Sequence, residues 1–372
     1  MTVRVGVVGV GNISPIYLQA PRRSPNLEVT AVGDLDLDRA RARAEEFGVP
    51  LALPLGELLA SDEVDVVLNL TVPAAHADVS LAALAAGKHV YSEKPLATDL
   101  SAGRAVLDLA RGRSLRVGCA PDTFLGAGLQ TARKALDDGL IGEPVAASAF
   151  MLGHGPERWH PNPDFFYQPG AGPMFDMGPY YLTALVNMLG PVRRVAASAR
   201  ASFPERVAGE DPSGRRFPVS TPTHVACTLD FDAGPVATLV TSFDVWASEL
   251  PRIEIYGTEG TLSLPDPNTF GGPVRVRRML TDDWETLPLT HPHEDNSRGI
   301  GLADMALALA EGRAHRASGE LALHVLEVMH ATLVSGEQGR HLDIETRPAR
   351  PAALPATLPA APSDSETREV TP

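Results

Sequence analysis

The chain contains very little cysteine. Only Cys119 and Cys227 occur in 372 residues, and both lie in apolar segments that resemble strands. Neither has partners at metal-ligand spacing, which argues against a disulfide framework and against a cysteine-based metal centre. We interpret both as buried thiols of a cytoplasmic protein.

Positive charge and long apolar runs are also scarce. Lys and Arg number 32 against 46 Asp and Glu, so the net charge is −14. The basic residues are scattered, which argues against nucleic acid as a partner because phosphate recognition needs clustered positive charge. No apolar run approaches the about 18 residues that a membrane span needs. Residues 5–9 are too short and too glycine-rich for a signal peptide core and are expected to lie in the first strand.

The apolar content is ordinary, at 44%, and 372 residues are enough for two domains, each with its own core. Short apolar runs alternate with helical patterns early in the chain, at residues 3–8, 29–33, 64–70, 89–91 and 115–119. This alternation predicts a Rossmann-type doubly wound parallel sheet, an α/β fold with helices on both faces. We expect a nucleotide-binding domain over residues 1–120.

From about residue 142 the pattern changes to strand-length segments, at residues 145–150, 192–199, 225–231, 236–243, 252–256 and 261–264. Most later connections are too short for helical crossovers. We therefore expect a second α+β domain over residues 121–347, with an open, mainly antiparallel or mixed sheet and a helix from about Asp176 on one face. Residues 348–372 are rich in Pro and Ala, have little to bury, and are expected to be an extended or disordered tail.

A glycine turn follows the first predicted strand. The segment Gly9-Val10-Gly11-Asn12-Ile13-Ser14 lets the backbone turn sharply and approach a pyrophosphate, which the N-terminus of the next helix stabilises. Ser14 replaces the third glycine of the usual fingerprint, so helix and strand are expected slightly farther apart. Gly9, Gly11, Asn12 and Ile13 are the expected cofactor contacts.

The second predicted strand ends in Asp34, at the distance expected for a carboxylate that hydrogen-bonds the adenosine ribose. Such a carboxylate repels a 2′-phosphate, so NAD is expected in preference to NADP. Arg39 and Arg41 leave NADP open, because a nearby arginine can accept the phosphate. An alternative is that Asp34 and Asp36 only cap the following helix.

The tripeptide Glu93-Lys94-Pro95 follows the strand at residues 89–91, at the sheet edge where open α/β folds bind ligands. Hydride transfer from a carbinol leaves a hydroxyl proton to be taken up, and the reverse reaction must protonate an alkoxide. A lysine here can stabilise that alkoxide and lower the pKa of a neighbouring phenol. The competing interpretation is a solvated surface lysine.

Asp176 and Tyr180 are four residues apart, which places them on one face if residues 177–190 are helical. Pro179 supports a helix start at this position. Tyr180 is the candidate phenol and Asp176 the accompanying carboxylate. The alternative is structural, with Asp176 as a helix cap and Tyr180 as a core aromatic.

Taken together, the glycine turn, Glu93-Lys94-Pro95 and Asp176-Met177-Gly178-Pro179-Tyr180 resemble the Gfo/Idh/MocA family, named after glucose–fructose oxidoreductase and inositol dehydrogenase, over residues 1–347. The resemblance implies an NAD(P)-dependent oxidoreductase with Lys94, Asp176 and Tyr180 as catalytic residues, assembled as a homodimer or homotetramer. Most members carry histidine at the position of Tyr180. This chain is similar to the branch with glucose–fructose oxidoreductase and dimeric dihydrodiol dehydrogenase, in which the phenol is the proton donor.

The same resemblance places the segment Asn69-Leu70-Thr71-Val72-Pro73 along the nicotinamide side of the cofactor, and His76 belongs to the same motif. Asn69, Thr71, Pro73, His76, Glu93 and Lys94 are therefore added to the expected cofactor-binding residues. For His76, a local structural role at the start of a helix stays open.

Four residues before the Gly170-Ala171-Gly172 turn are candidates for the substrate pocket, namely Trp159, His160, Asn162 and Tyr167. Aromatic faces and polar groups suit a polyol, but packing of Trp159 and Tyr167 onto the sheet stays equally open. Arg298 is a weak candidate to approach the active site. His291, His293 and Asp295 are interpreted as a solvated loop, and no metal site is expected.

The sequence thus predicts an NAD-dependent oxidoreductase acting on a carbinol or carbonyl of a sugar, inositol or related polyol. Two alternatives stay open. One is a glycoside hydrolase or epimerase that retains NAD, which net NADH formation would distinguish. The other is a non-catalytic regulatory protein that binds NAD and a sugar, against which Lys94 and Tyr180 argue.

Overall fold

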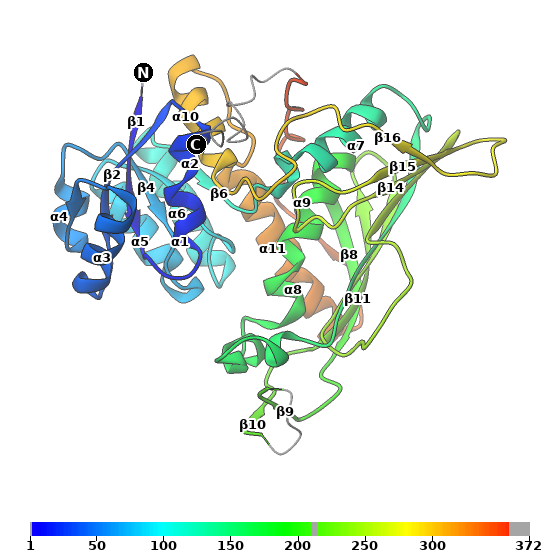
Figure 1. Ribbon diagram of the computed structural model, residues 1–372. Coiled ribbons are helices and arrows are strands. Elements are labelled where there is room, and N and C mark those ends of the chain that lie inside the picture. The colour runs from blue at the N-terminus through cyan, green and yellow to red at the C-terminus, as the bar shows by residue number, and fades with distance from the viewer. Residues whose placement is uncertain (1, 210–213, 357–372) are drawn as a thin grey trace, which may run out of the picture.

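The predicted parallel sheet is present in the first domain of the computed structural model, which describes residues 2–209 and 214–356 (Figure 1). Its six strands are β1 (Val3–Val8), β2 (Leu27–Gly33), β3 (Leu51–Ala52), β4 (Val66–Asn69), β5 (His89–Ser92) and β6 (Val117–Cys119). They pair in the order β3-β2-β1-β4-β5-β6. The strand order reverses between β1 and β4, which is where open α/β sheets bind their ligands.

Helices cover both faces of this sheet, as expected for strands whose side chains are buried on both sides. They are α1 (Ser14–Leu18), α2 (Ala20–Arg23), α3 (Leu37–Phe47), α4 (Leu55–Ala60), α5 (His76–Ala85) and α6 (Leu100–Gly112), with a single turn of 3-10 helix, η1 (Pro73–Ala75), before α5. The Rossmann-type prediction is confirmed.

The second domain contains a nine-stranded mixed sheet in the order β16-β15-β14-β13-β7-β12-β11-β8-β17. Its strands are β7 (Pro144–Leu152), β8 (Val192–Arg200), β11 (His224–Phe231), β12 (Val236–Ser242), β13 (Ile253–Gly257), β14 (Gly260–Leu264), β15 (Val274–Arg278), β16 (Glu285–Leu287) and β17 (Leu342–Asp343). Neighbours are antiparallel except β7 and β12. The strands β9 (Glu205–Val207) and β10 (Arg216–Pro218) form a separate hairpin-like pair.

Helices of the second domain lie between its sheet and the first domain (Figure 1). They are α7 (Ala127–Asp137), α8 (Gly172–Asp176), α9 (Gly178–Leu189) and α11 (Gly319–Gln338), with the 3-10 turns η2 (Thr123–Leu125), η3 (Pro156–Arg158) and η4 (Pro163–Tyr167). The helix α10 (Ile300–Glu311) lies beside the first domain, where it packs on β6. Every residue of α9 is buried. A helix with apolar side chains all round belongs in the middle of a structure, which explains its place between the two sheets.

The later helices also contact the first domain. The helix α11 packs on α6 and β6, and Cys119 N–H donates to Ala317 O (3.0 Å) at the edge of the parallel sheet. A Cβ at Gly103 of α6 would lie 2.9 Å from a methyl group of Leu326, so these helices approach closely. The two domains therefore share a continuous apolar core, which fixes the cleft between them.

The expectation that the chain has little to pack beyond Pro348 is wrong for residues 348–356. Leu354 is buried, and its N–H donates to Gln130 Oε1 (2.8 Å). His291, interpreted from the sequence as solvated, is buried instead, and its Nε2 lies 3.0 Å from Leu354 O. Arg133 donates to Pro351 O (2.8 Å). Residues 357–372 of the predicted tail lie outside the described residues.

Two further predictions concern the two cysteines and the lack of a membrane-spanning helix. Cys119 and Cys227 are buried free thiols, as predicted. No helix within residues 2–209 and 214–356 is long and apolar enough to cross a membrane.

Candidate active site

The predicted glycine turn follows β1. Gly9 has a φ of +90°, and a Cβ there would lie 2.8 Å from the backbone C and O of Leu70. Gly9 N–H donates to Gly33 O (2.8 Å), and Ser14 Oγ donates to Gly11 O (2.8 Å). No atom lies within 4 Å of a Cβ built at Gly11. The turn is fixed by close backbone packing on one side and open on the other, a shape that fits a pyrophosphate.

Asp34, directly after β2, faces this turn. Its Oδ2 accepts Val10 N–H (2.9 Å), and its Oδ1 accepts Asp36 N–H (2.9 Å) and Arg39 Nη2 (2.5 Å). Burial alone would raise the pKa of Asp34, but these hydrogen bonds outweigh it and the net pKa is lowered. Asp36, not Asp34, caps α3, by accepting Asp38 N–H and Arg39 N–H. Capping therefore explains Asp36 and leaves Asp34 as an ionised group beside the turn.

Two of the expected cofactor contacts are buried instead. Asn69 Nδ2 donates to His76 O (3.0 Å) and Ser80 Oγ (3.2 Å), while its Oδ1 accepts Thr71 Oγ1 (2.6 Å). The His76 ring lies between Pro95 O (2.7 Å from Nδ1) and Thr71 O (3.0 Å from Nε2). Because the side chain at the end of β4 points under α5, Asn69 and His76 hold the loops around them in position, and their contact with a cofactor stays a prediction. Thr71 and Pro73 keep partly open positions at the cleft.

Lys94 leaves the end of β5 and reaches the second domain. Its Nζ donates to Asp176 O (2.8 Å) and lies 3.1 Å from Asp176 Oδ1. The carboxylate of Glu93 links the Lys94 backbone to α1, because Oε2 accepts Lys94 N–H (3.0 Å) and Oε1 accepts Tyr17 OH (2.6 Å). Burial lowers the pKa of Lys94, but the charges of Asp176, Tyr180 and Glu93 outweigh burial and raise it overall. The ammonium is therefore a stable positive charge in the cleft.

The predicted helix over residues 177–190, with Pro179 in its first turn, is present as α9 (Gly178–Leu189), but Asp176 lies just outside it. Asp176 ends α8, Met177 interrupts the helix, and Tyr180 lies in the first turn of α9. Asp176 does not cap α9, and its backbone and carboxylate oxygens face Lys94 instead. Lys94 Nζ lies 5.1 Å from the centre of the Tyr180 ring. The two residues thus meet at Lys94, as expected, but across a helix break.

Tyr180 is 8% exposed, and burial raises the pKa of its phenol. The positive charges of Lys94 and Arg298 lower the pKa, as expected for Lys94, but burial outweighs them and the pKa is raised overall. At neutral pH the phenol therefore carries its proton. The Tyr180 phenol can therefore act as a proton donor beside the positive charge of Lys94.

Arg298, a weak candidate from sequence, faces the hydroxyl of Tyr180. Its guanidinium donates to Asn268 Oδ1 and Asn296 Oδ1, both at 2.9 Å. Asp122, which follows β6, accepts Gly299 N–H (2.8 Å) from the same loop. Burial raises the pKa of Asp122 to about 6. The Arg298 loop is thus tied to the sheet edge that carries Lys94.

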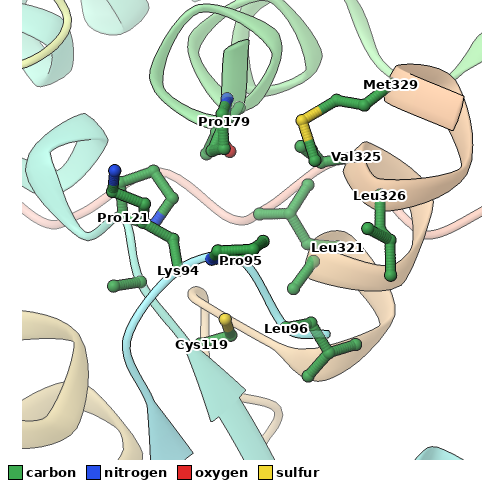
Figure 2. A pocket seen from close by; sticks show the side chains of 13 residues that line it. Lys94, Pro95, Leu96, Cys119, Pro121, Pro179, Leu321, Val325, Leu326 and Met329 are labelled. Carbon is green, nitrogen blue, oxygen red and sulfur yellow. The ribbon is translucent and has the colours of Figure 1, made fainter. Parts of the chain in front are cut away.

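A small cavity lies behind Lys94, between its loop and α11 (Figure 2). Its volume is about 10 Å³ and its lining is almost entirely apolar, including Pro95, Leu321, Val325 and Met329. A space of this size holds at most one water, and an apolar one stays dry. This cavity is too small to hold a substrate.

A larger cleft of about 570 Å³ opens on the other side of Lys94 and Asp176. The first domain contributes residues of the loops after β4 and β5, namely Thr71, Val72, Pro73, Ala74, Lys94, Pro95 and Thr98. The second domain contributes residues of η4, of α8 and of the loop between them, namely Phe165, Phe166, Pro169, Gly170, Ala171, Phe175 and Asp176. This size suits a small-molecule ligand.

The four predicted substrate residues are not among the described residues that line this cleft. Tyr167 is fully buried between Phe217 and Phe243, and its hydroxyl donates to Glu157, so it is a core residue. Trp159 is 71% exposed. The structural alternative is therefore correct for Tyr167, and substrate binding by the other three residues stays a prediction.

His160 and Asn162 also belong to the segment before the cleft. The His160 ring makes edge contacts with Phe165 and Phe166, each at 5.2 Å between centroids, and Asn162 is exposed. The lining aromatics Phe165 and Phe166 follow directly, but no pattern in the sequence distinguishes them from their neighbours. Asp122 was detectable, because it follows a parallel strand at the ligand-binding edge.

Comparison with known proteins identifies two family models in the chain. The model described as "Oxidoreductase family, NAD-binding Rossmann fold" matches residues 3–120. The model described as "GFO/IDH/MocA C-terminal domain" matches residues 129–263.

Curated relatives align over most of the chain. Inositol 2-dehydrogenase 3 of Saccharopolyspora erythraea is 30% identical over 298 residues, which is 77% of this chain and 80% of the relative. The dTDP-3,4-didehydro-2,6-dideoxy-alpha-D-glucose 3-reductase of Streptomyces antibioticus is 30% identical over 318 residues, 83% of this chain and 89% of the relative. Among solved structures, an NAD binding oxidoreductase from Klebsiella pneumoniae superposes with a TM-score of 0.83 at 23% identity, covering 93% of this chain and 100% of that chain.

Proposed function

Because the chain belongs to the Gfo/Idh/MocA family of oxidoreductases, we propose that it exchanges a hydride between a nicotinamide cofactor and a hydroxyl-bearing carbon of a sugar or cyclic polyol. The observation that carries this proposal is the meeting of Lys94, Asp176 and Tyr180 where the two domains face each other. Relatives named as inositol dehydrogenases and sugar reductases support the substrate class.

The residues at the β1, β2 and β4 loops fit a dinucleotide. Gly9 and Gly11 leave room for a pyrophosphate close to the backbone, with Asn12 and Ile13 at the exposed crest of the turn. The ionised carboxylate of Asp34 can accept hydrogen bonds from the hydroxyls of the adenosine ribose. Thr71 and Pro73 line the same cleft as Lys94 and are the expected contacts of the nicotinamide end of the cofactor. When bound, NAD supplies the hydride acceptor, and NADH the donor.

The protein groups handle the proton. In oxidation, the carbinol loses a hydride from carbon and a proton from oxygen and becomes a carbonyl, and Tyr180 takes that proton as phenolate. In reduction, the neutral phenol of Tyr180 gives its proton to the alkoxide oxygen. Lys94 remains charged throughout, because its pKa is raised, and stabilises negative charge on either oxygen. Asp176 holds the ammonium at 3.1 Å from its carboxylate.

The proposal is tested by incubating the protein and NAD with a panel of aldoses, inositols and diols and measuring NADH formation. Net NADH with at least one of them is expected. Turnover of a substrate without net NADH would instead favour the alternative in which the protein retains NAD for a transient oxidation. The same panel with Tyr180→Phe controls for NADH formed by a contaminating enzyme.

We further propose that the protein is a cytoplasmic homo-oligomer that associates through the outer face of the nine-stranded sheet. The described helices pack on the inner face, while Val145 and Val236, at the starts of the central strands β7 and β12, are 51% and 46% exposed. Exposed apolar side chains on an open sheet favour association. Light scattering on the purified protein is expected to give a dimer or tetramer, and a monomer at micromolar concentration would contradict this.

A further inference from the structure

The peptide bond between Arg298 and Gly299 is held at both ends by charged side chains. Arg23, the last residue of α2, donates from Nη2 to Arg298 O (3.0 Å), and Asp122 Oδ2 accepts Gly299 N–H (2.8 Å). The same oxygen of Asp122 also accepts Gly301 N–H (3.0 Å). Hydrogen bonds to charged groups are about twice as strong as those between neutral groups, so this peptide is held more firmly than an ordinary loop peptide.

The start of α10 fits closely against the first domain at the same place. A Cβ at Gly299, where φ is +101°, would lie 2.7 Å from Ala20 Cβ, and a Cβ at Gly301 would lie 2.9 Å from Asp122 Cβ. These approaches are too short for any side chain, so glycine is required at both positions. Asp122 is 1% exposed and Arg23 is half-buried. The segment therefore has little freedom to move relative to α2 and β6.

Arg298 carries a positive charge from this peptide to the reacting phenol. Its guanidinium faces the Tyr180 hydroxyl, and its charge lowers the pKa of that phenol against the effect of burial. The guanidinium also lies 5.8 Å from the centre of the Phe270 ring and donates to Asn268 Oδ1 (2.9 Å). Because the side chain begins at the held peptide, displacing that peptide moves the charge away from Tyr180.

The supports of Lys94 and of Arg298 both come from the helix pair α1–α2, which follows the glycine turn. Tyr17 of α1 donates to Glu93, whose other carboxylate oxygen accepts Lys94 N–H. Arg23 of α2 donates to the carbonyl of Arg298. One element of the first domain thus supports the cation and also the residue that faces the phenol.

We propose that Arg23 and Asp122 are positioning residues that hold the Arg298 guanidinium against the hydroxyl of Tyr180. They act through the Arg298–Gly299 peptide, one on its carbonyl and the other on its N–H. This inference rests on the proposed function, because it takes Tyr180 as the group that exchanges the proton. Two other roles must be separated from it, namely a purely structural contact between the domains and a direct effect of the two charges on the phenol.

The direction in which the pKa of Tyr180 changes separates these roles. Asp122 is negative, so removing its charge alone lowers the phenol pKa, whereas moving Arg298 away raises it. Asp122→Ala is expected to raise the pKa by about one unit, because two N–H groups lose their acceptor and the loop shifts. Asp122→Asn keeps an oxygen acceptor at the same place and is expected not to raise it.

The pKa is measured on the full chain in the presence of NAD, with 3-fluorotyrosine in place of tyrosine. Fluorine makes the phenol more acidic, which moves its titration to lower pH. The chain has six tyrosines, and the fluorine NMR signal of Tyr180 is the one missing in Tyr180→Phe. Lys94, Glu93 and Arg298, whose charges act on this phenol, are unchanged in every variant. The remaining signals and thermal unfolding show whether a variant is folded.

Arg23 gives a second test that leaves Asp122 in place. Arg23→Ala is expected to raise the Tyr180 pKa by about half a unit, and Arg23→Lys, which retains a charged donor, by less. Arg22→Ala is the matched control, because Arg22 is the exposed neighbour in α2 and its replacement removes the same charge. A pKa that falls or stays constant in Asp122→Ala, or that rises equally in Arg23→Ala and Arg22→Ala, overturns the proposal.

The measurement needs no substrate, which separates this inference from the proposed function. If the panel of sugars and polyols gives NADH but the Tyr180 pKa does not rise in Asp122→Ala, the proposed function stands and the positioning role is wrong. If the pKa rises as expected but no member of the panel gives NADH, the positioning role is correct and the proposed function is wrong.

Discussion

The two sides of the interdomain cleft are held in place by different kinds of contact. On the first-domain side, the functional side chains follow parallel strands and are bonded to neighbouring loops: Asp34 to Val10 N–H, and Glu93 to Tyr17 OH. Lys94 extends this chain of bonds to Asp176. The positions of these groups are therefore set before any ligand binds.

The facing segment of the second domain is built from short turns and apolar contacts. It comprises η3, η4 and α8, and the aromatic rings of Phe165 and Phe166 contact each other and His160. Ring contacts of this type are less directional than hydrogen bonds, so this wall can adapt to its ligand. Hydrogen bonds thus hold the first-domain side chains and Asp176, whereas ring contacts hold the segment around Phe165 and Phe166.

The largest expected effect is at Tyr180, which lies in the second domain beside Lys94. Tyr180→Phe keeps the ring and its packing but removes the transferable proton, so turnover is expected to fall by roughly 10²–10⁴. NAD affinity and thermal stability are expected to stay close to those of the unmodified protein. Steady-state kinetics and NAD titration check both statements.

Lys94→Ala is the companion variant and is expected to lose a comparable factor. The double variant is expected to lose less than the product of the two single losses, since residues that act as a unit are not additive. If Tyr180→Phe turns over normally, the proton must pass through Lys94 or through a water held by Asp176.

The next effect concerns the support of α9, the helix that carries Tyr180. Leu354→Ala is expected to lower the free energy of unfolding by about 2–5 kcal/mol, because it leaves a cavity where the C-terminal segment docks. Leu280→Ala is the control, since that leucine is 95% exposed. Urea denaturation measures both. A small effect at Leu354 would mean that residues 348–356 contribute little to the second domain.

A smaller effect is expected at Arg298, which we class as a positioning residue for the Tyr180 phenol. Arg298→Ala removes a positive charge that lowers the phenol pKa, so oxidation should be about 10- to 100-fold slower near neutral pH. Its dependence on pH should shift toward more alkaline values. Asn268→Ala, which removes one hydrogen-bond partner of the guanidinium, should shift it in the same direction by less. A slower rate with an unshifted pH profile would contradict this role.

The smallest predicted effect is the choice of cofactor on the fixed side of the cleft. At least a tenfold preference for NAD over NADP is expected, about 1.4 kcal/mol, and Asp34→Ser should erode it. Arg39 pairs with Asp34, so Arg39→Ala separates repulsion by the carboxylate from attraction by the guanidinium. Equal or tighter binding of NADP by the unmodified protein would show that Arg39 reads the 2′-phosphate.

The same contrast explains what could be predicted from the sequence. The strands around the parallel sheet, Asp34 and Lys94 were found because each functional residue directly follows an apolar run, and strand ends meet at one edge. The start of α9 was predicted from Pro179, but the five-residue helix α8 before it was not, because so short a segment shows no helical periodicity.

The aromatic lining of the cleft could not be predicted from the sequence. Whether Trp159, Phe165 or Tyr167 points into a cleft depends on the path of a loop with two 3-10 turns, and aromatic residues suit core and pocket alike. The docking of residues 348–356 was missed for a related reason. A Pro- and Ala-rich composition indicates an extended chain, and it does not indicate whether Leu354 finds a partner surface.

The central claim, that Tyr180 exchanges the proton beside a permanently charged Lys94, is tested most directly by the pH dependence of kcat/KM for oxidation. Burial raises the phenol pKa above its ordinary value, so the phenolate is scarce at pH 7. As long as the pH is below that pKa, each increase of one pH unit raises the phenolate fraction about tenfold. The unmodified protein is therefore expected to show a rate that rises steadily from neutral to alkaline pH, and Tyr180→Phe is expected to lose this rise. A profile that is flat in the unmodified protein, or equally steep in Tyr180→Phe, would contradict the account.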